Sequence, residues 1–467
     1  MPEGYIEFFK VVYSMISKED FINAIIANKQ ENGISAFVGA GLCSDAQMPD
    51  WLHLLQPCAE ELGVSIDENT DLFKFAQYYA NTFGYNKLRK LINKTLNTYQ
   101  HDSTLVSSIL NVGFKSIWTT NYDKIIENNI VKLNAFSNTI FDEKDLVNIS
   151  WQNRINIFKL NGDISNLNNI VITQSDIDNY QNNHALFLTF LKRELVTNTF
   201  IFIGYSFNDH IVLSALAEIN QYLGESSNTH YTIMKNKHTD EFKMFIEDLE
   251  KRYHIKTVLV EEYAEIPLLL DKLKRRILDS NVFISGSFEY LPSAEDTFAY
   301  SLCKSLGEKL IDSNYNIVTG FGRNIGYYIS GVVTQKIINN NIGNIEERLI
   351  LRPFAHIMTS EEDTQFRKLL ISNANSTVYM FGQHLKNGQP ENSRGTLEEY
   401  KLAKSMKKII IPLGVTGYSS REIFNDVKKN LICYPYLEQY IDVLENERDV
   451  DIISSCIISI LNRVRTS

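Results

Sequence analysis

The chain has 467 residues, of which 44% are hydrophobic and 22% are charged, a balance typical of globular proteins. This length exceeds what one ordinary hydrophobic core supports, so we expect two domains. A net charge of -10 makes a nucleic-acid-binding surface a poor first hypothesis. The five cysteines are scattered without a Cys-x-x-Cys pair, which argues against a zinc ribbon or a disulfide framework and fits a reducing cytoplasm.

Residues 1–30 open the chain with the apolar spacing of one or two amphipathic helices. Such a segment either caps its own domain or docks on a neighbouring subunit. The N-terminus lacks the basic, apolar and small-residue order of a signal peptide, and the longest apolar runs have the length of strands. We therefore expect a cytoplasmic protein that does not associate with membranes.

Strand-like segments then alternate with helical patterns, which predicts a parallel, doubly wound α/β sheet in a Rossmann-like domain over residues 31–279. The expected strands are 35–38, 116–119, 156–160, 199–203, 230–234 and 256–260. In such sheets ligands bind beyond the carboxyl ends of the strands. Gly39, Asn121, Asn161 and Gly204 each fall at or just after a strand end, so we predict that they share one site.

Three short motifs mark these strand ends. Residues 37–44 read Phe-Val-Gly-Ala-Gly-Leu-Cys-Ser, and the two glycines let the backbone approach a pyrophosphate at a helix N-terminus. Alone this motif is weak, because many tight turns need small residues. It is followed by Trp-Thr-Thr-Asn-Tyr-Asp at 118–123 and by Lys-Leu-Asn-Gly-Asp at 159–163.

Together the three motifs resemble the sirtuin family, whose pattern is a Gly-Ala-Gly loop, a Thr-x-Asn-x-Asp strand end and a His-Gly segment. The resemblance implies that NAD+ is the substrate. The histidines of the chain do not have the spacing of metal ligands, so we expect no metal site. The residues that it implies for NAD+ binding are Gly39, Ala40, Gly41, Ser44, Asp45, Asp123, Gly204 and Ser206. Two of these positions have simpler interpretations, since Asp123 can cap the next helix and Ser206 can belong to a simple turn. Nearby Asp209 can cap a helix and needs no catalytic role.

We expect Asn121 and Asn161 to be the catalytic pair. The amide of Asn121 offers a donor and an acceptor without charge, which suits it to orienting a water or the ribose hydroxyls. At position 161 the family carries a histidine that acts as a general base, and asparagine cannot take up a proton. Either the site is naturally degenerate, or the substitution was engineered to preserve NAD+ binding while stopping turnover. The intact remainder of the site favours the second account.

A second α/β block follows at 280–467. It begins with a strand that runs into a Gly-Ser turn at 281–287, continues with a helix at about 294–313, and contains later strands at 348–351, 376–381 and 408–412. The block resembles the SLOG superfamily, a Rossmann-like nucleotide-sensing fold. The related phosphoribohydrolases carry Pro-Gly-Gly-x-Gly-Thr-x-x-Glu, of which only Gly395, Thr396 and Glu399 remain here. The resemblance therefore implies ligand binding rather than phosphoribohydrolase activity.

A sirtuin-like domain followed by a SLOG domain is similar, over nearly the whole chain, to the NADase effectors of Thoeris antiphage systems. In that family a cyclic ADP-ribose isomer, made by a partner TIR-domain protein, binds the SLOG domain and activates the sirtuin-like domain. The resemblance also implies a homo-tetramer or a higher homo-oligomer. The candidate activator-binding residues are Ser285, Gly286, Ser287, Arg352, Arg367, His384, Gly395 and Glu399, although the related effectors carry a lysine where this chain has His384. For each arginine taken singly, a surface salt bridge is the favoured interpretation. Together, at successive βα junctions, the arginines favour a nucleotide ligand with two negative charges.

Two other functions compete with NAD+ hydrolysis. One is NAD+-dependent protein deacylation, but the chain has no set of four cysteines for the zinc site of those sirtuins. The other is a nucleotide sensor with a decayed catalytic half, which Asn161 supports. The leading hypothesis is an NAD+ hydrolase that releases nicotinamide and ADP-ribose, depletes NAD+ on infection, and is impaired in this chain by Asn161.

Overall fold

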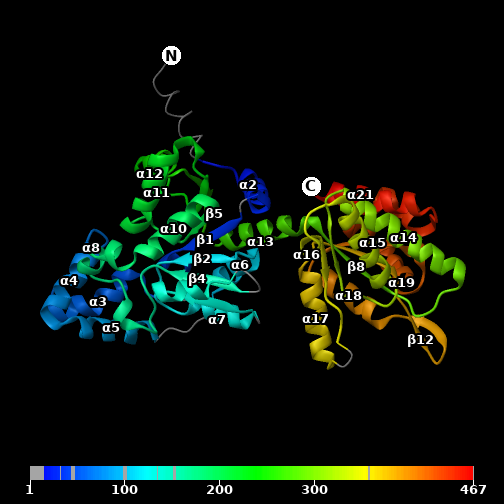
Figure 1. Cartoon of the computed structure of the whole chain (residues 1–467), viewed down its shortest axis with the longest axis horizontal. Helices are drawn as coiled ribbons and strands as arrows, with labels where there is room; N and C mark the ends of the chain where they lie inside the picture. Colours follow the sequence, from blue (N-terminus) through cyan, green and yellow to red (C-terminus); the bar gives the residue numbers. More distant parts are fainter. Residues whose placement is uncertain are drawn as a thin grey trace, which may run out of the picture. The chain divides into compact units, whose positions relative to one another are not determined.

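The computed structural model describes residues 15–31, 33–43, 48–97, 103–133, 135–150, 154–355 and 358–465. Ser44, Asp45 and the first part of the expected helical segment 1–30 lie outside these residues. The chain forms two compact units that divide between Lys274 and Arg275 (Figure 1). No helix among the described ranges is long and apolar enough to cross a membrane.

The first unit is built on a seven-stranded sheet in which every neighbouring pair of strands is parallel, in the order β3-β4-β2-β1-β5-β6-β7. The strands are β1 (Ile34–Val38), β2 (Ser116–Thr119), β3 (Ser137–Ile140), β4 (Ile155–Lys159), β5 (Thr199–Ile203), β6 (His230–Lys235) and β7 (Ile255–Val260). The predicted doubly wound fold is confirmed, and β3 is an additional edge strand.

The helices of the first unit fall between these strands and beside them. They are α2 (Lys18–Glu31), α3 (Trp51–Leu62), α4 (Leu72–Phe83), α5 (Tyr85–Asn97), α6 (Thr104–Val112), α7 (Ile125–Lys132), α8 (Gln174–Asp178), α9 (Tyr180–Asn183), α10 (Ala185–Thr197), α11 (His210–Leu223) and α12 (Asp240–Tyr253). The helix α13 (Glu265–Ile277) contains the boundary between the units. Short polar side chains start several of these helices by accepting backbone N–H groups, as Asp50, Asp71 and Ser103 do.

Aromatic packing fixes one face of the first sheet. Trp118 of β2 stacks on Phe158 of β4 with ring centroids 4.2 Å apart, and Phe187 of α10 meets the Trp118 ring edge-on. A smaller core joins α3, α4 and α5 to Tyr122, Ile170 and Ile172, which lie in the loops beyond β2 and β4. These three helices therefore pack against the carboxyl side of the sheet, where Figure 1 draws them beyond one end of the strands.

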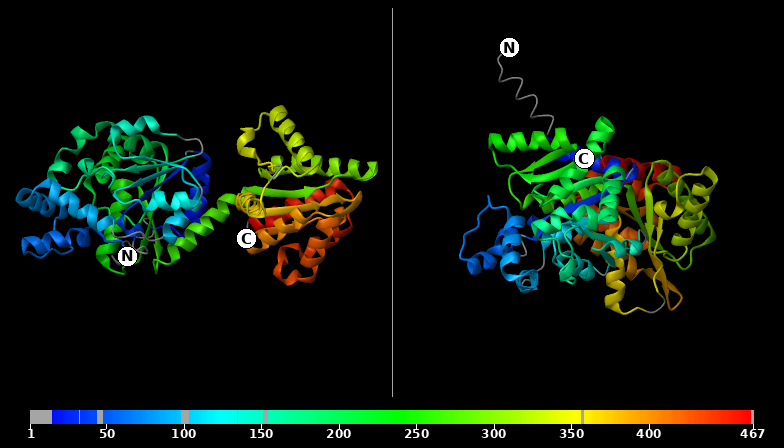
Figure 2. Two further views of the ribbon diagram at one scale, coloured as in Figure 1. Left: turned by 90° about the horizontal axis from the view of Figure 1, so that it is seen from below. Right: turned by 60° about the vertical axis from the view of Figure 1, so that its left-hand side comes forward.

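The second unit is a five-stranded parallel sheet in the order β10-β9-β8-β11-β14, with a separate hairpin of β12 and β13. Its strands are β8 (Asn281–Ser287), β9 (Asn316–Thr319), β10 (Leu349–Leu351), β11 (Ser376–Phe381), β12 (Gln383–Lys386), β13 (Gln389–Asn392) and β14 (Ile409–Pro412). Its helices are α14 (Ser293–Asp312), α15 (Ile325–Asn340), α16 (Ile345–Arg348), α17 (Ser360–Ser372), α18 (Arg394–Ser405), α19 (Tyr418–Lys429), α20 (Ile441–Asn446) and α21 (Val450–Arg465). The last helix, α21, packs along α14 (Figure 2).

Candidate functional site

The strand register aligns the carboxyl ends of four strands, β1, β2, β4 and β5, at one edge of the first sheet. Val38 of β1 pairs with Thr119 of β2 on one side and with Ile203 of β5 on the other, and Thr119 is aligned with Lys159 of β4. Asn121 and Asn161 both lie two residues beyond an aligned pair. The register therefore brings the loops that carry the predicted catalytic pair next to each other.

The glycine loop after β1 interlocks with the turn after β5. Gly39 N–H donates to the Ile203 carbonyl (3.2 Å), and Gly41 N–H donates to the Gly204 carbonyl (3.0 Å). A Cβ atom at Gly39 would lie 2.5 Å from the Gly204 carbonyl oxygen, and Gly204 itself has φ +62°. Only glycine fits these positions, because a side chain would force the two loops apart. The chain order of the sheet reverses between β1 and β5, which is where doubly wound folds bind ligands.

Asn121, which follows β2, forms a hydrogen bond with the glycine loop. It is 8% exposed, its Nδ2 donates to the Gly39 carbonyl (3.2 Å), and its backbone N–H donates to Thr119 Oγ1 (3.0 Å). Asp123 Oδ1 accepts the Ile125 N–H (2.9 Å), so the structure gives this carboxylate a helix-starting contact. Its part in NAD+ binding stays a prediction, as does that of Ser206, which is exposed in the turn after β5.

Asn161 has a buried, unsatisfied oxygen. The residue is 6% exposed, and its Oδ1 has no hydrogen-bond partner within the described part of the chain. The following Gly162 has φ +86°, and a Cβ there would lie 2.6 Å from the Asn169 carbonyl oxygen. A buried acceptor without a donor calls for an explanation, and a ligand hydroxyl is a suitable donor.

Asp209, which the sequence predicts only as a helix cap, is a neighbour of Asn161 in the structure. Its Oδ1 does cap α11 by accepting the Ile211 N–H (2.9 Å). Burial raises the pKa of Asp209, opposed by the N–H groups of Ile211 and Val212 and by the Asn161 amide, which donates to this carboxylate. The hydrogen bond from the residue 161 amide assigns Asp209 to the site, and sequence spacing alone carried no signal for it.

Buried tyrosines surround this pair. Tyr122 Oη donates to the Val171 carbonyl (2.7 Å), and Tyr180 Oη donates to the Leu160 carbonyl (2.8 Å). Burial raises the pKa of both hydroxyls, and the Asp209 charge raises it further. The same causes, burial first, raise the pKa of Tyr205. These hydroxyls stay neutral at physiological pH, so Asp209 is the titratable group placed beside residue 161.

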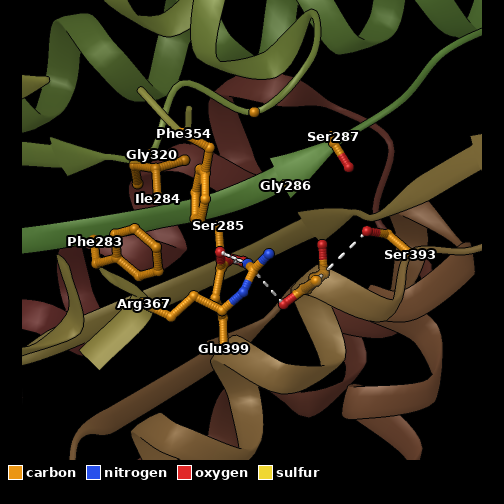
Figure 3. Close-up of a pocket in the computed structure, with 13 residues that line it drawn as sticks. Phe283, Ile284, Ser285, Gly286, Ser287, Gly320, Phe354, Arg367, Ser393 and Glu399 are labelled. Carbon is orange, nitrogen blue, oxygen red and sulfur yellow. Dashed lines mark hydrogen bonds and ion pairs between the residues drawn. The ribbon is translucent and has the colours of Figure 1, made fainter. Parts of the chain in front are cut away.

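A pocket in the second unit contains most of the predicted activator-binding residues (Figure 3). The residues that line it come from β8, the loops after β9 and β10, α17, and α18 with the residue before it: Phe283, Ile284, Ser285, Gly286, Ser287, Gly320, Gly322, Phe354, Arg367, Ser393, Gly395, Thr396 and Glu399. The chain order of this sheet reverses between β8 and β11, so the pocket too lies at a topological switch point.

Arg367 and Glu399 form the polar centre of this pocket. Arg367 Nη1 donates to Glu399 Oε1 and to the Gly395 carbonyl (3.2 Å), its Nε lies 3.0 Å from Asp363 Oδ2, and its guanidinium lies 4.5 Å from the Phe354 ring centroid. Ser285 Oγ donates to Glu399 Oε2 (2.5 Å). Burial raises the pKa of Glu399, and Arg367 and Ser285 oppose that shift.

Arg352 and His384 are not among the pocket-lining residues. Arg352 is exposed just after β10, and its backbone N–H donates to the Thr319 carbonyl (3.1 Å). His384 lies in β12, and its buried Nδ1 has no hydrogen-bond partner within the described ranges. Their contact with an activator therefore stays a prediction. Among the described residues, no group of three or more His, Cys, Asp or Glu side chains is arranged to hold a metal ion.

Comparison with known families divides the chain as the two sheets do. A model of the SIR2-like domain matches residues 115–258, and a model of the Sir2- and TIR-associating SLOG family matches residues 265–464. The "NAD(+) hydrolase ThsA" of Enterococcus faecium is 29% identical over 470 residues, which cover 93% of this chain and 97% of the relative. The "NAD(+) hydrolase ThsA" of Bacillus cereus (strain MSX-D12) is 27% identical over 434 residues, with 89% and 90% covered. "Defense-associated sirtuin 2" of Bacillus subtilis is 25% identical over 215 residues, which cover 44% of this chain and 21% of that protein.

Proposed function

Because this chain belongs to the Thoeris effector family, in which a SIR2-like domain precedes a Sir2- and TIR-associating SLOG domain, we propose that it is an NAD+ hydrolase of antiphage defence. The reaction cleaves the nicotinamide–ribose bond of NAD+ with water, giving nicotinamide and ADP-ribose. The aligned strand ends support the proposal most, since they bring the glycine loop, Asn121 and residue 161 to one edge of the sheet.

The proposed roles follow from the chemistry of each group. The Gly39–Gly41 loop lets the backbone approach the pyrophosphate closely, and the Asn121 amide orients the attacking water or the ribose. Residue 161 contacts the ribose hydroxyls. As asparagine it accepts a hydrogen bond through Oδ1 but takes up no proton, so the chain as written binds NAD+ and turns it over slowly.

The second unit is the proposed regulatory half. A cyclic ADP-ribose isomer, supplied by a TIR-domain partner, occupies the pocket of Arg367 and Glu399 and activates the first unit. An activator shifts an equilibrium only when it binds the active arrangement more tightly than the resting one. Homo-oligomer formation is part of this proposal by family resemblance.

Nicotinamide release by the chain as written and by an Asn161→His variant, each with and without a cyclic ADP-ribose isomer, tests the proposal. Loss of a general base typically costs about 100- to 10,000-fold in rate, so the histidine variant should be faster by that order.

Adding Asn121→Ala to Asn161→His should abolish release with little change in melting temperature. Equal turnover with Asn and His at position 161 would remove the proposed role of this position, and release dependent on an acylated peptide would indicate a deacylase.

A further inference from the structure

The ammonium group of Lys159 is buried beneath the predicted catalytic loops. Lys159 is the last residue of β4, and only 1% of its side chain is exposed, which is rare for lysine. Its Nζ lies 2.7 Å from Asp163 Oδ2 and 3.1 Å from Glu127 Oε1. It also donates to the backbone carbonyls of Asp123 and Tyr122, the second at 3.4 Å.

These contacts join two loops that are far apart in the chain. Asp163 belongs to the loop after β4, whereas the two carbonyls belong to the loop after β2. Asp163 Oδ1 also lies 2.7 Å from Lys124 Nζ and accepts the Ser165 N–H (2.8 Å), and its side chain is fully buried. A backbone hydrogen bond from Ile164 N–H to the Tyr122 carbonyl (3.0 Å) completes the connection.

The charges in this cluster stabilise one another. Burial lowers the pKa of Lys159, but the attraction of Glu127, Asp163 and Asp123 outweighs it, and the net shift is upward. Burial raises the pKa of Asp163, but Lys159 and Lys124 outweigh it, and the net shift is downward. Both groups are therefore ionised at neutral pH.

We propose that the Lys159–Asp163 pair is a positioning device that fixes the loop of Asn121 against the loop of residue 161. Asn121 lies next to Tyr122, whose carbonyl accepts from Lys159, and residue 161 lies between the two members of the pair. Neither charged group contacts NAD+ in this proposal, which rests on the proposed function; both act through the two asparagines. A misplacement of about 1 Å between reacting groups costs on the order of 100-fold in rate.

Stability alone is a weaker account of the pair. Replacing both members of a buried ion pair with neutral side chains of similar size is often neutral or stabilising, whereas removing one member leaves a buried charge without its partner. A double substitution leaves Lys124 and Glu127, whose charged groups lie 3.8 Å apart, to compensate each other, so it separates positioning from folding. Lys159→Met with Asp163→Asn retains the volume, and the new amide still offers an oxygen to the Ser165 N–H.

The test compares this double variant with a matched pair of substitutions, Lys192→Met with Glu218→Gln, which removes the 2.6 Å ion pair between α10 and α11. The first measurement is amide hydrogen exchange in the chain as written. We expect faster exchange at residues 120–124 and 160–165 in the Lys159 double variant. The matched variant should exchange at these residues as the unmodified chain does, and the two variants should have similar melting temperatures. Unchanged exchange in both loops would overturn the proposal.

The second measurement is nicotinamide release with Asn161→His as the parent. We expect kcat to fall by about 100-fold in the Lys159 double variant with KM nearly unchanged, because the glycine loop that faces the pyrophosphate is intact. An active parent with equal kcat in the double variant would refute positioning. A parent without any release would instead refute the proposed hydrolase, and the exchange measurement would still decide the role of the pair.

Discussion

The side chain of Asn161 combines two properties that rarely occur together: it is buried, and its acceptor oxygen has no donor among the residues that the structure describes. An unsatisfied buried polar atom typically costs about 1–3 kcal/mol, so the position is better explained by a ligand than by packing. Its amide nitrogen donates to Asp209, and in the proposed NAD+ complex the oxygen accepts from a ribose hydroxyl. In the proposed mechanism, asparagine in place of the family histidine removes the proton acceptor and keeps a hydrogen-bonding side chain at this position.

Asp209→Asn, made in the Asn161→His background, should shift the pH profile of nicotinamide release to lower pH. An ionised carboxylate beside an imidazolium stabilises the charged imidazole and raises its pKa, so removing the charge lowers that pKa and keeps the base unprotonated to lower pH. The other titratable groups around Asp209 are the neutral hydroxyls of Tyr122, Tyr180 and Tyr205, and His210 beside it in the chain.

The melting temperature should hardly change, because asparagine caps a helix as well as aspartate does. Asp50→Asn, at the start of α3, is the control, since Asp50 accepts the His53 N–H (2.8 Å) without touching the site. A profile that moves to the same extent in both variants, or in neither, would leave Asp209 with only its capping role.

Secondary-structure elements with apolar, buried patterns were predictable, and polar ones were not. β5 and β11 lie where the sequence places them, because every residue of each is buried and apolar or β-branched residues dominate. β3 reads Ser-Asn-Thr-Ile and is half-exposed at the sheet edge, so periodicity carries no signal for it. The strands β12 and β13 are equally polar, although Asn387 and Gly388 between them, both with positive φ, are a recognisable hairpin turn.

Within each candidate site, some residues can be predicted from the sequence and others cannot. Residues at strand ends, such as Asn121 and Ser285, follow from where a buried run stops. The partners that complete each site come from elements distant in the chain: Asp209 from the start of α11, Phe354 from the loop after β10. Only the fold brings such residues together, so a single sequence without its structure could not assign them.

At the element scale, α17 and α18 meet through Arg367 and Glu399, and Arg367→Ala should weaken binding of the proposed activator, a cyclic ADP-ribose isomer. Three carboxylates already surround the guanidinium, those of Asp363, Glu398 and Glu399, so its removal also leaves uncompensated negative charge in the pocket. We expect at least a tenfold rise in Kd by calorimetry, consistent with about 1.5–3 kcal/mol for a hydrogen bond to a charged group.

Lys404→Ala is the matched control, because Lys404 lies near the other end of α18 and pairs with Asp426 (2.9 Å) outside the pocket. NAD+ affinity should be the same in both variants. Unchanged activator affinity in Arg367→Ala, with the fold intact, would remove Arg367 from the binding site.

At the scale of the whole molecule, each unit has a hydrophobic core of its own. One continuous core in the second unit runs from Val282 to Leu461 and involves no residue before Arg275. A unit with a separate core is expected to fold alone. We therefore expect that cutting the chain between the units separates the proposed activator binding from NAD+ hydrolysis.

A fragment of residues 275–467 should therefore unfold in one cooperative transition and bind the activating isomer with nearly the affinity of the full chain. Calorimetry and thermal melting check both points, and the same fragment with Glu399→Gln is the control for the pocket. A folded fragment that binds no cyclic ADP-ribose isomer would contradict the assignment of the second unit as the sensor.

The interlocked glycine loops also have a consequence for biosynthesis. β1 leaves the ribosome early, but its partner β5 begins only at Thr199, and the Gly39–Gly41 loop rests on Gly204. Parallel pairing between strands so distant in sequence is slow, because the intervening chain must be ordered first. Nascent chains that stop before β5 lack the turn at Gly204 against which the glycine loop packs. The proposed NAD+ site therefore cannot form until most of the first domain has been synthesised.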